Sequence, residues 1–159
     1  MSDRSRDIIE RLGLVRHPEG GWYRQLYQSR ATVTTPHGTR SALTTIYYLL
    51  KKGEVGRWHV IDADEVWHFY SGARLELLIY DPQSTQLTRC ELGSPDKGSE
   101  AVGIVPVGVW QAARSRGDYS LVGCSVGPGF EFDGFQFVSS IPDHERHFKG
   151  ELGAFSNLL

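Results

Sequence analysis

The chain has 159 residues, a formal net charge of -2 and a pI near 6.3. This length fits one domain, which buries roughly 70% of the surface of its unfolded chain and so needs neither disulfides nor a structural metal to fold. The charge argues against a broad basic surface for nucleic acid or anionic lipid, and no apolar run approaches the roughly 20 residues that span a bilayer. We therefore expect a single domain over residues 1–159, with neither nucleic acid nor membrane as a partner.

Two further features bear on the cellular compartment. The N-terminal segment, MSDRSRDIIERLGLV, has charges where a secretory signal places its apolar core. Cys90 and Cys124 are far apart and form no CxxC pattern, so we expect two ordinary thiols in a reducing cytosol, with a disulfide as the alternative. Together these features predict a cytoplasmic protein.

The chain begins with one predicted helix. Residues 3–12 favour an amphipathic helix, because Ile8, Ile9 and Leu12 fall at helical spacing and Gly13 is placed to end it. The sequence HPEGG at residues 17–21 is a predicted loop, and residues 32–39, which contain Pro36 and Gly38, are a predicted turn.

Short strands occupy most of the remaining chain. β-branched and aromatic runs bounded by turn residues predict strands over residues 22–28, 42–50, 56–61, 65–71, 75–80, 86–91, 101–105, 110–113, 119–126 and 130–137. Residues 93–98 are a polar loop, and residues 142–159 are predicted to close one end as a helix. His144 and His147 lie in this tail, where a solvated helix is favoured over a metal pair. So many short strands, separated by some of the 18 glycines, predict an all-β barrel or sandwich.

The most informative spacing lies between Gly53 and Gly72, in the run GEVGRWHVIDADEVWHFYSG. His59, Ile61 and Glu65 stand inside this run at intervals that resemble the first motif of the cupin superfamily, in which Gly, His-x-His, Glu and Gly occur in order. The run from Pro106 to Gln111, PVGVWQ, resembles the second cupin motif, a Pro-x-Gly turn with a histidine three residues after the glycine. Ile61 and Gln111 therefore stand where that pattern has histidine.

The resemblance extends to HPEGGWYRQLY, TTIYYLL, DADEVWHFYSG and SLVGCSVGPGFEFDGFQF, which are similar to one branch of small cupins found in bacteria, fungi and plants and long catalogued as a domain of unknown function. It implies an all-β cupin double-stranded β-helix, a jelly-roll barrel with a short N-terminal helix and room for a C-terminal one. The branch is commonly dimeric, so the resemblance also implies a homodimer.

The motif has a physical reading as well. Residues two apart in a strand face the same side, so His59 and Ile61 should point together into the barrel. Glu65 can approach His59 across the hairpin, and Gln111 would join from the opposite sheet. One imidazole, one carboxylate and one amide are a weak set for a transition metal. We therefore expect no cofactor, or at most a weakly bound divalent metal on His59, Glu65 and Gln111.

Without a metal, His59 and Glu65 become a candidate acid–base pair for proton abstraction beside a carbonyl. This favours a metal-independent or weakly metal-dependent isomerase, epimerase or lyase that acts on a small polar metabolite such as a sugar derivative. Gln111 would orient that ligand. The other candidate ligand-binding residues are Ile61, Trp67 and Phe69, which share the alternation phase of Glu65, and Tyr48, a hydroxyl donor.

Other interpretations use the same residues. His59 and Glu65 can be a buried hydrogen-bonded pair that only joins two strands, and Trp67 and Phe69 can be ordinary core residues. The barrel can also be a non-catalytic module that binds or senses a small molecule. A third hypothesis is a metal-dependent oxygenase or hydrolase in which water replaces the missing imidazoles.

Overall fold

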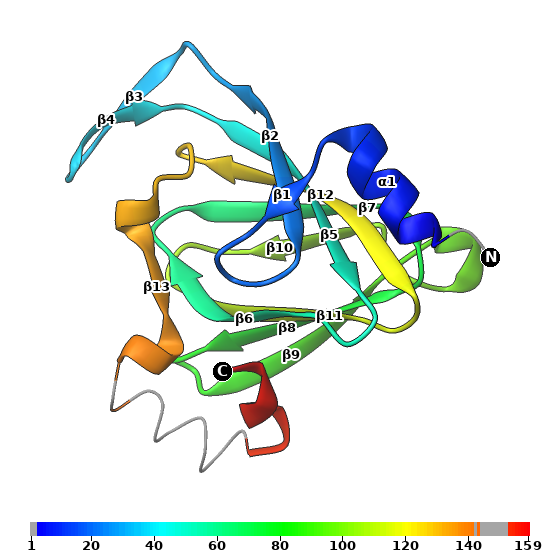
Figure 1. The fold of residues 1–159 in the computed structure, drawn as a ribbon. Coiled ribbons are helices and arrows are strands. Elements are labelled where there is room, and N and C mark those ends of the chain that lie inside the picture. The colour runs from blue at the N-terminus through cyan, green and yellow to red at the C-terminus, as the bar shows by residue number, and fades with distance from the viewer. Residues whose placement is uncertain (1–2, 142, 144–152) are drawn as a thin grey trace.

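The computed structural model describes residues 3–141, 143 and 153–159, and it contains two antiparallel sheets that face each other (Figure 1). The six-stranded sheet has the order β1 (Val15–Arg16), β2 (Trp22–Gln28), β5 (Thr44–Lys51), β12 (Tyr119–Gly127), β7 (Asp64–Gly72) and β10 (Val102–Val105). The five-stranded sheet has the order β13 (Phe135–Phe137), β6 (Val55–Ile61), β11 (Trp110–Ser115), β8 (Leu75–Asp81) and β9 (Gln86–Leu92).

The chain passes repeatedly from one sheet to the other. β5 and β7 lie in the six-stranded sheet while β6 and β8 lie in the five-stranded one, and β9 to β13 alternate in the same way. This is the two-sheet jelly roll that the sequence predicts. Within the described residues the sheets share no paired strands, so they stay face to face rather than merging into one continuous ring.

The main core fills the space between the sheets. Side chains from both inner faces meet there, and most of them are fully buried: Tyr48, Leu50, Trp67, Leu75, Leu77, Leu92, Val105, Ala113, Val122 and Cys124. Their strands point alternate residues inward, as a half-buried sheet requires. This core occupies the interior toward one end and leaves the other end for the pocket described below.

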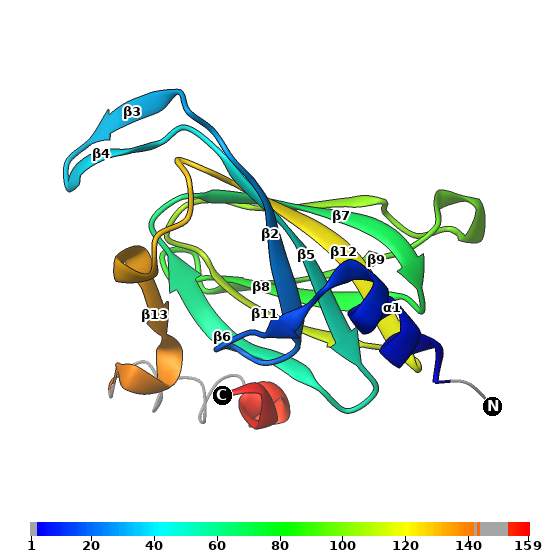
Figure 2. The same ribbon diagram turned by 45° about the horizontal axis from the view of Figure 1, so that its top comes forward.

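The N-terminal helix covers the outer face of the six-stranded sheet (Figure 2). α1 (Arg4–Leu12) begins after Asp3, whose side chain accepts a hydrogen bond from the Ser5 backbone N–H at 3.1 Å, and it ends at Gly13 as expected. Ile9 packs with Leu49 and Leu121 of the sheet. The helix therefore buries an apolar surface that an antiparallel sheet would otherwise expose.

A C-terminal 3-10 helix (Gly153–Leu158) covers the outer face of the five-stranded sheet. Phe155 and Leu158 pack with the fully buried Trp58, whose indole N–H donates to the Phe155 carbonyl at 3.2 Å. The described part of the tail is thus helical, but in the tighter 3-10 form. Most of the predicted tail helix over 142–159, including His144 and His147, lies outside the described residues.

Two predicted elements are wrong. Residues 32–39 are not a single turn, because β3 (Thr32–Thr35) and β4 (Gly38–Ser41) pair as a hairpin that projects from the end of the molecule in Figure 1. Only Pro36 and His37 form the turn, and the β-branched residues before them extend as a strand.

No helix in the described parts of the chain is long and apolar enough to cross a membrane.

The second error is the strand predicted over 130–137. Residues Phe132–Gly134 form a 3-10 turn, and only Phe135–Phe137 pairs with β6 as β13. A continuous strand would place Phe130 and Phe132 on the opposite face from Phe135. The break instead brings these three rings together, with centroids 4.9 to 6.4 Å apart.

Candidate functional site

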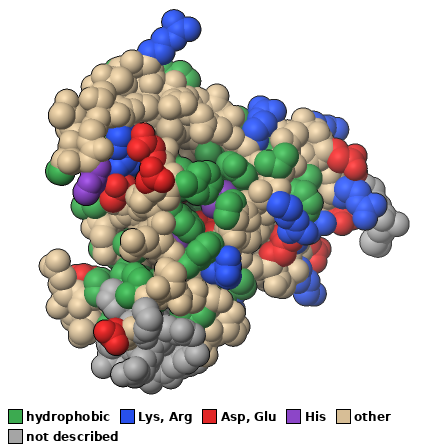
Figure 3. All heavy atoms as spheres, turned by 60° about the vertical axis from the view of Figure 1, so that its left-hand side comes forward, with side chains coloured by type: hydrophobic (Ala, Val, Ile, Leu, Met, Phe, Trp, Pro, Cys, Tyr) green, Lys and Arg blue, Asp and Glu red, His purple; other side chains and the backbone are tan. Residues whose placement is uncertain are grey.

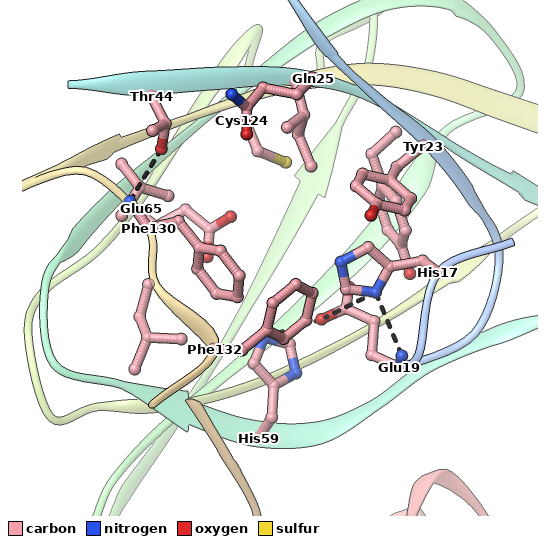
Figure 4. Close-up of a pocket in the computed structure, with 14 residues that line it drawn as sticks. His17, Glu19, Tyr23, Gln25, Thr44, His59, Glu65, Cys124, Phe130 and Phe132 are labelled. Carbon is pink, nitrogen blue, oxygen red and sulfur yellow. Dashed lines mark hydrogen bonds and ion pairs between the residues drawn. The ribbon is translucent and has the colours of Figure 1, made fainter. Parts of the chain in front are cut away.

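A pocket of about 80 Å³ opens between the sheets at the end where the hairpin projects. Hydrophobic side chains surround a hollow on the face shown in Figure 3, and histidine is visible inside it. Figure 4 shows the lining side chains, which converge from the loop after β1, from β2, β5, β6, β7 and β12, and from the segment after β12. They are His17, Glu19, Tyr23, Gln25, Thr44, Ile46, Tyr48, His59, Ile61, Glu65, Cys124, Val126, Phe130 and Phe132.

Strand alternation explains most of this lining. β5 contributes Thr44, Ile46 and Tyr48, every second residue, and β6 contributes His59 and Ile61 in the same way. His59 and Ile61 therefore share one face, as the sequence predicts. Polar side chains that include His17, Glu19, His59 and Glu65 lie among aromatic and aliphatic walls, a combination that suits a small-molecule site.

The loop between β1 and β2 carries two lining residues, His17 and Glu19. Gly20 and Gly21, with φ of 110° and 75°, bring this loop close to the sheets. A Cβ on Gly20 would overlap the Val55 carbonyl oxygen, and one on Gly21 would meet β5. The loop is also fixed to β6, because the Arg57 N–H donates to the Glu19 carbonyl at 3.0 Å.

His59 is held between the loop and the sheet. Its Nδ1 lies 2.7 Å from the Arg57 carbonyl, so Nδ1 carries a proton and donates, since a carbonyl oxygen can only accept. Its Nε2 lies 3.2 Å from Glu19 Oε2. The ring also stacks on Phe135, with centroids 4.9 Å apart. His59 and Glu19 are both more than nine-tenths buried and form one proton-sharing pair.

Glu65 enters the pocket from β7 and is fixed from behind. The Gln111 amide N–H donates to Glu65 Oε2 at 2.6 Å, and the Gln111 amide oxygen accepts from the Trp67 indole N–H at 3.0 Å. Because the indole can only donate, the Gln111 amide has one possible orientation. This chain of two hydrogen bonds holds the Glu65 carboxyl in place, and Figure 4 shows the carboxyl inside the pocket.

Burial raises the proton affinity of both carboxyls. It raises the pKa of Glu19 to about 8, although Tyr48 and Arg57 oppose the shift. Burial also raises the pKa of Glu65 to about 7, against the lowering effect of His59. Both acids therefore hold their protons to much higher pH than exposed carboxyls do.

The same burial lowers the proton affinity of both histidines. It lowers the pKa of His17 to about 4, and the charge of His59 adds to this effect. Burial lowers the pKa of His59 as well, although Glu65 and the Arg57 carbonyl oppose the change. Near pH 7 the favoured state therefore has neutral imidazoles, and Glu19 keeps the proton that it shares with His59.

The structure divides the predicted site residues into two groups. His59, Glu65, Ile61 and Tyr48 line the pocket, and the Tyr48 hydroxyl donates to the Gly20 carbonyl at 2.8 Å.

Gln111, Trp67 and Phe69 do not line this pocket. Gln111 and Trp67 lie behind Glu65, and Phe69 packs against the main core. Each two-residue step along β7 moves the side chain about 6.6 to 6.8 Å, so residues in phase with Glu65 soon leave the pocket and enter the core.

His17 and Glu19 also line the pocket, although the sequence pattern predicts only a loop for the segment that contains them. A signal is nevertheless present in HPEGG, because two titratable residues, His17 and Glu19, stand within three residues of a Gly-Gly pair. A loop with two consecutive glycines at positive φ can approach other backbone closely. Alternation rules cannot detect such residues, since the loop has no strand periodicity.

The donors at the motif positions do not fit a transition metal. Ile61 has no ligating atom, both polar atoms of Gln111 are engaged with Glu65 and Trp67, and His59 Nε2 faces Glu19. Across residues 3–141, 143 and 153–159, no three His, Cys, Asp or Glu side chains are grouped to hold a metal ion.

Comparison with known proteins shows which family and which solved structures the chain is similar to. The family model described as "Cupin superfamily (DUF985)" matches residues 6–138. A Shewanella oneidensis protein of solved structure is 34% identical, with a TM-score of 0.80 over 96% of this chain and 94% of that one. A hypothetical protein from Leishmania major is 30% identical, with a TM-score of 0.77 over 88% and 93%.

More distant similarity extends to the fold alone. Oxalate decarboxylase from Bacillus subtilis is 16% identical, with a TM-score of 0.61 over 91% of this chain and 36% of that one. No curated protein matches the sequence.

Proposed function

Because the chain belongs to the DUF985 family of the cupin superfamily, we propose that its pocket catalyses proton transfer on a small polar metabolite. The enzyme is an isomerase, epimerase or lyase that is metal-independent or only weakly metal-dependent. Fold alone does not supply this function. The proposal depends on the side chains that face the pocket.

One observation carries the proposal. Two proton-transfer groups line the same pocket: the Glu65 carboxyl, and the Glu19–His59 pair joined over 3.2 Å. The pKa of Glu65 is about 7 and that of Glu19 about 8. The Gln111 amide donates to Glu65 and so favours its ionised form. Glu65 is therefore assigned as the general base, and the Glu19–His59 pair, which shares one proton, as the general acid.

Gln111 has a positioning role in this scheme. It was expected to orient the substrate directly, but its amide donates to Glu65 and accepts from Trp67. It therefore sets the direction of the Glu65 carboxyl. A base fixed by a hydrogen-bonded neighbour loses less orientational freedom in the transition state.

We expect the wild-type protein to exchange carbon-bound hydrogen for deuterium in a small carbonyl compound dissolved in D₂O. The panel contains small ketoses, keto acids and their phosphate esters, and proton NMR follows loss of the C–H signal. Glu65→Gln keeps the size of the side chain but removes the base, so exchange should fall at least about 100-fold. This assay requires no knowledge of the product.

Glu91→Gln is the matched control, because Glu91 is an exposed partner of Arg74 outside the pocket. It should exchange at the wild-type rate. Exchange that survives in both Glu65→Gln and His59→Gln would overturn the proposal. Binding without exchange by wild type would favour the non-catalytic module, and loss of exchange on chelation, restored by one divalent metal, would favour the metal-dependent alternative.

We also propose that the protein forms a homodimer. Val102 and Ile104 are exposed on β10, which is an edge strand of the six-stranded sheet. Exposed apolar residues on a sheet edge favour pairing with another chain. Native mass spectrometry should give twice the chain mass, and a monomer at micromolar concentration would contradict this expectation.

A further inference from the structure

His17 is a buried polar side chain that the proposed acid–base scheme does not use. Its side chain is 7% exposed and lies among aromatic rings, with Tyr23 at 4.6 Å and Tyr48 at 5.6 Å between centroids, both edge-on. These rings fix the imidazole plane. His17 therefore has the rigid placement that ligand contacts require.

The backbone also fixes the tautomer of His17. The Glu19 N–H donates to His17 Nδ1 at 3.1 Å, so Nδ1 is an acceptor and carries no proton in the neutral ring. The single proton of that ring must then be on Nε2. Figure 4 shows this second nitrogen directed into the pocket. Among the described residues, no group accepts a hydrogen bond from it.

The ring remains neutral at physiological pH. Burial and the nearby His59 lower the pKa of His17 to about 4, so at pH 7 the imidazole is a neutral donor. A neutral donor can hold a carbonyl oxygen without transferring its own proton to the base. Its hydrogen bond strengthens as negative charge develops on that oxygen.

The charges around the pocket restrict the substrate. Two buried carboxyls, Glu19 and Glu65, line it, and none of the described residues in its wall is Lys or Arg. An anionic group placed beside these acids would lack a compensating cation and would repel the ionised base. The pocket is therefore suited to an uncharged ligand.

We infer that the His17 Nε2–H holds the carbonyl oxygen of the substrate and that this substrate is a small uncharged carbonyl compound. The inference rests on the proposed function for the chemical step. Glu65 takes a proton from the carbon beside the carbonyl, and the C–H electron pair forms a C=C bond. The C=O electrons move to oxygen, which becomes an enolate oxygen bound to His17. The Glu19–His59 pair then gives a proton to that carbon, where the C=C electron pair forms the new C–H bond and the C=O bond is restored. Glu65 releases its proton to water and the Glu19–His59 pair takes one back.

Dihydroxyacetone and dihydroxyacetone phosphate form a matched pair of ligands that tests the inference. We expect dihydroxyacetone to bind at least about tenfold more tightly, since the phosphate meets two acids. Nitrogen-15 NMR of the free protein should show His17 with an unprotonated Nδ1 and a protonated Nε2 from pH 5 to 8. Dihydroxyacetone should then shift the Nε2 signal. These measurements require no turnover.

Variants give the second part of the test. His17→Leu removes the donor and should lower deuterium exchange by about 100- to 1000-fold, whereas His17→Gln keeps an N–H donor and should lose less. His37→Leu is the matched control, because His37 is exposed on the β3–β4 hairpin, and it should exchange like wild type.

Several results would overturn the inference. The first two concern binding: dihydroxyacetone phosphate binds as tightly as dihydroxyacetone or more tightly, or dihydroxyacetone does not bind. The other two concern His17: its imidazole titrates near pH 6.5, or His17→Leu exchanges deuterium at the wild-type rate. Selective binding of dihydroxyacetone without any exchange would instead overturn the proposed function and leave the assignment of His17 as ligand donor standing.

Discussion

Gly20→Ala is expected to lower the free energy of unfolding by about 4 kcal/mol or more, among the largest effects of a single substitution. Gly20 has φ of 110°, a backbone conformation that favours glycine. A Cβ at this position would overlap the carbonyl oxygen of Val55 on β6. Backbone cannot move aside as a flexible side chain can, so the loop must separate from the sheet. Chemical denaturation at constant pH measures the loss.

Gly38→Ala separates this contact from backbone strain. Gly38 has a similar φ of 118°, but no heavy atom lies within 4 Å of the Cβ that alanine would add. Gly38→Ala should therefore lower the free energy of unfolding only by the cost of backbone strain, about 1 to 2 kcal/mol. Equal losses in the two variants would show that the close approach to Val55 does not stabilise the fold.

Gly20→Ala should also affect the pocket. The loop that approaches β6 at Gly20 also carries His17 and Glu19, and Tyr48 donates to the Gly20 carbonyl. If the loop separates, His17 gains water and its pKa should return toward 6.5, because burial is the main cause of the low value. NMR titration of His17 in Gly20→Ala and Gly38→Ala checks this, and only the first variant should change.

Much of the fold follows from local sequence patterns. The strand predicted over residues 22–28 has the observed bounds, and the other predicted strands before residue 127 end within two residues of the observed ones. Alternation also placed His59 and Ile61 on one face and brought Glu65 into the same pocket. These are consequences of a period of two along a strand, which sequence displays directly.

The remaining parts depend on contacts between distant segments. Glu19 meets His59 across 40 positions of sequence, and the contact exists because two glycines bring a loop against β6. Trp67 and Phe69 have the alternation phase of lining residues, yet their distance along β7 places them in the core. The alternation of residues along a strand shows which face of the sheet a side chain lies on, but not whether its position along the strand is beside the pocket or in the core. The break at residues 132–134 likewise reflects aromatic clustering rather than a local strand signal.

The stability of the protein is expected to fall as pH rises from 6.5 to 8.5, by roughly 3 kcal/mol. In the folded chain the pKa of Glu65 is about 7 and that of Glu19 about 8, whereas both return to the ordinary value of 4.5 on unfolding. Over this interval the folded state binds more protons than the unfolded state. The stabilisation is complete below pH 4.5 and is lost as pH passes the folded pKa values.

The histidines oppose this trend only at lower pH. The pKa of His17 is about 4 in the folded chain and near 6.5 when unfolded, and the pKa of His59 is also lowered. Unfolding therefore takes up protons at these residues between about pH 4 and 6.5, which makes stability rise with pH there. Above pH 6.5 the unfolded histidines lose their remaining protons within about one pH unit, so they offset only part of the loss and the two carboxyls determine the sign of the slope.

Urea denaturation of wild type, Glu19→Gln and Glu65→Gln across this pH range measures the effect. Each variant lacks one titrating acid, so its stability should depend less on pH, and at pH 8.5 it should have lost less of its pH 6.5 stability than wild type. Glu91→Gln, which removes an exposed carboxyl, should follow wild type. A wild-type stability that stays constant or rises between pH 6.5 and 8.5 would show that the pocket does not hold these protons, and the assignment of Glu65 as base and the Glu19–His59 pair as acid would then fail with it.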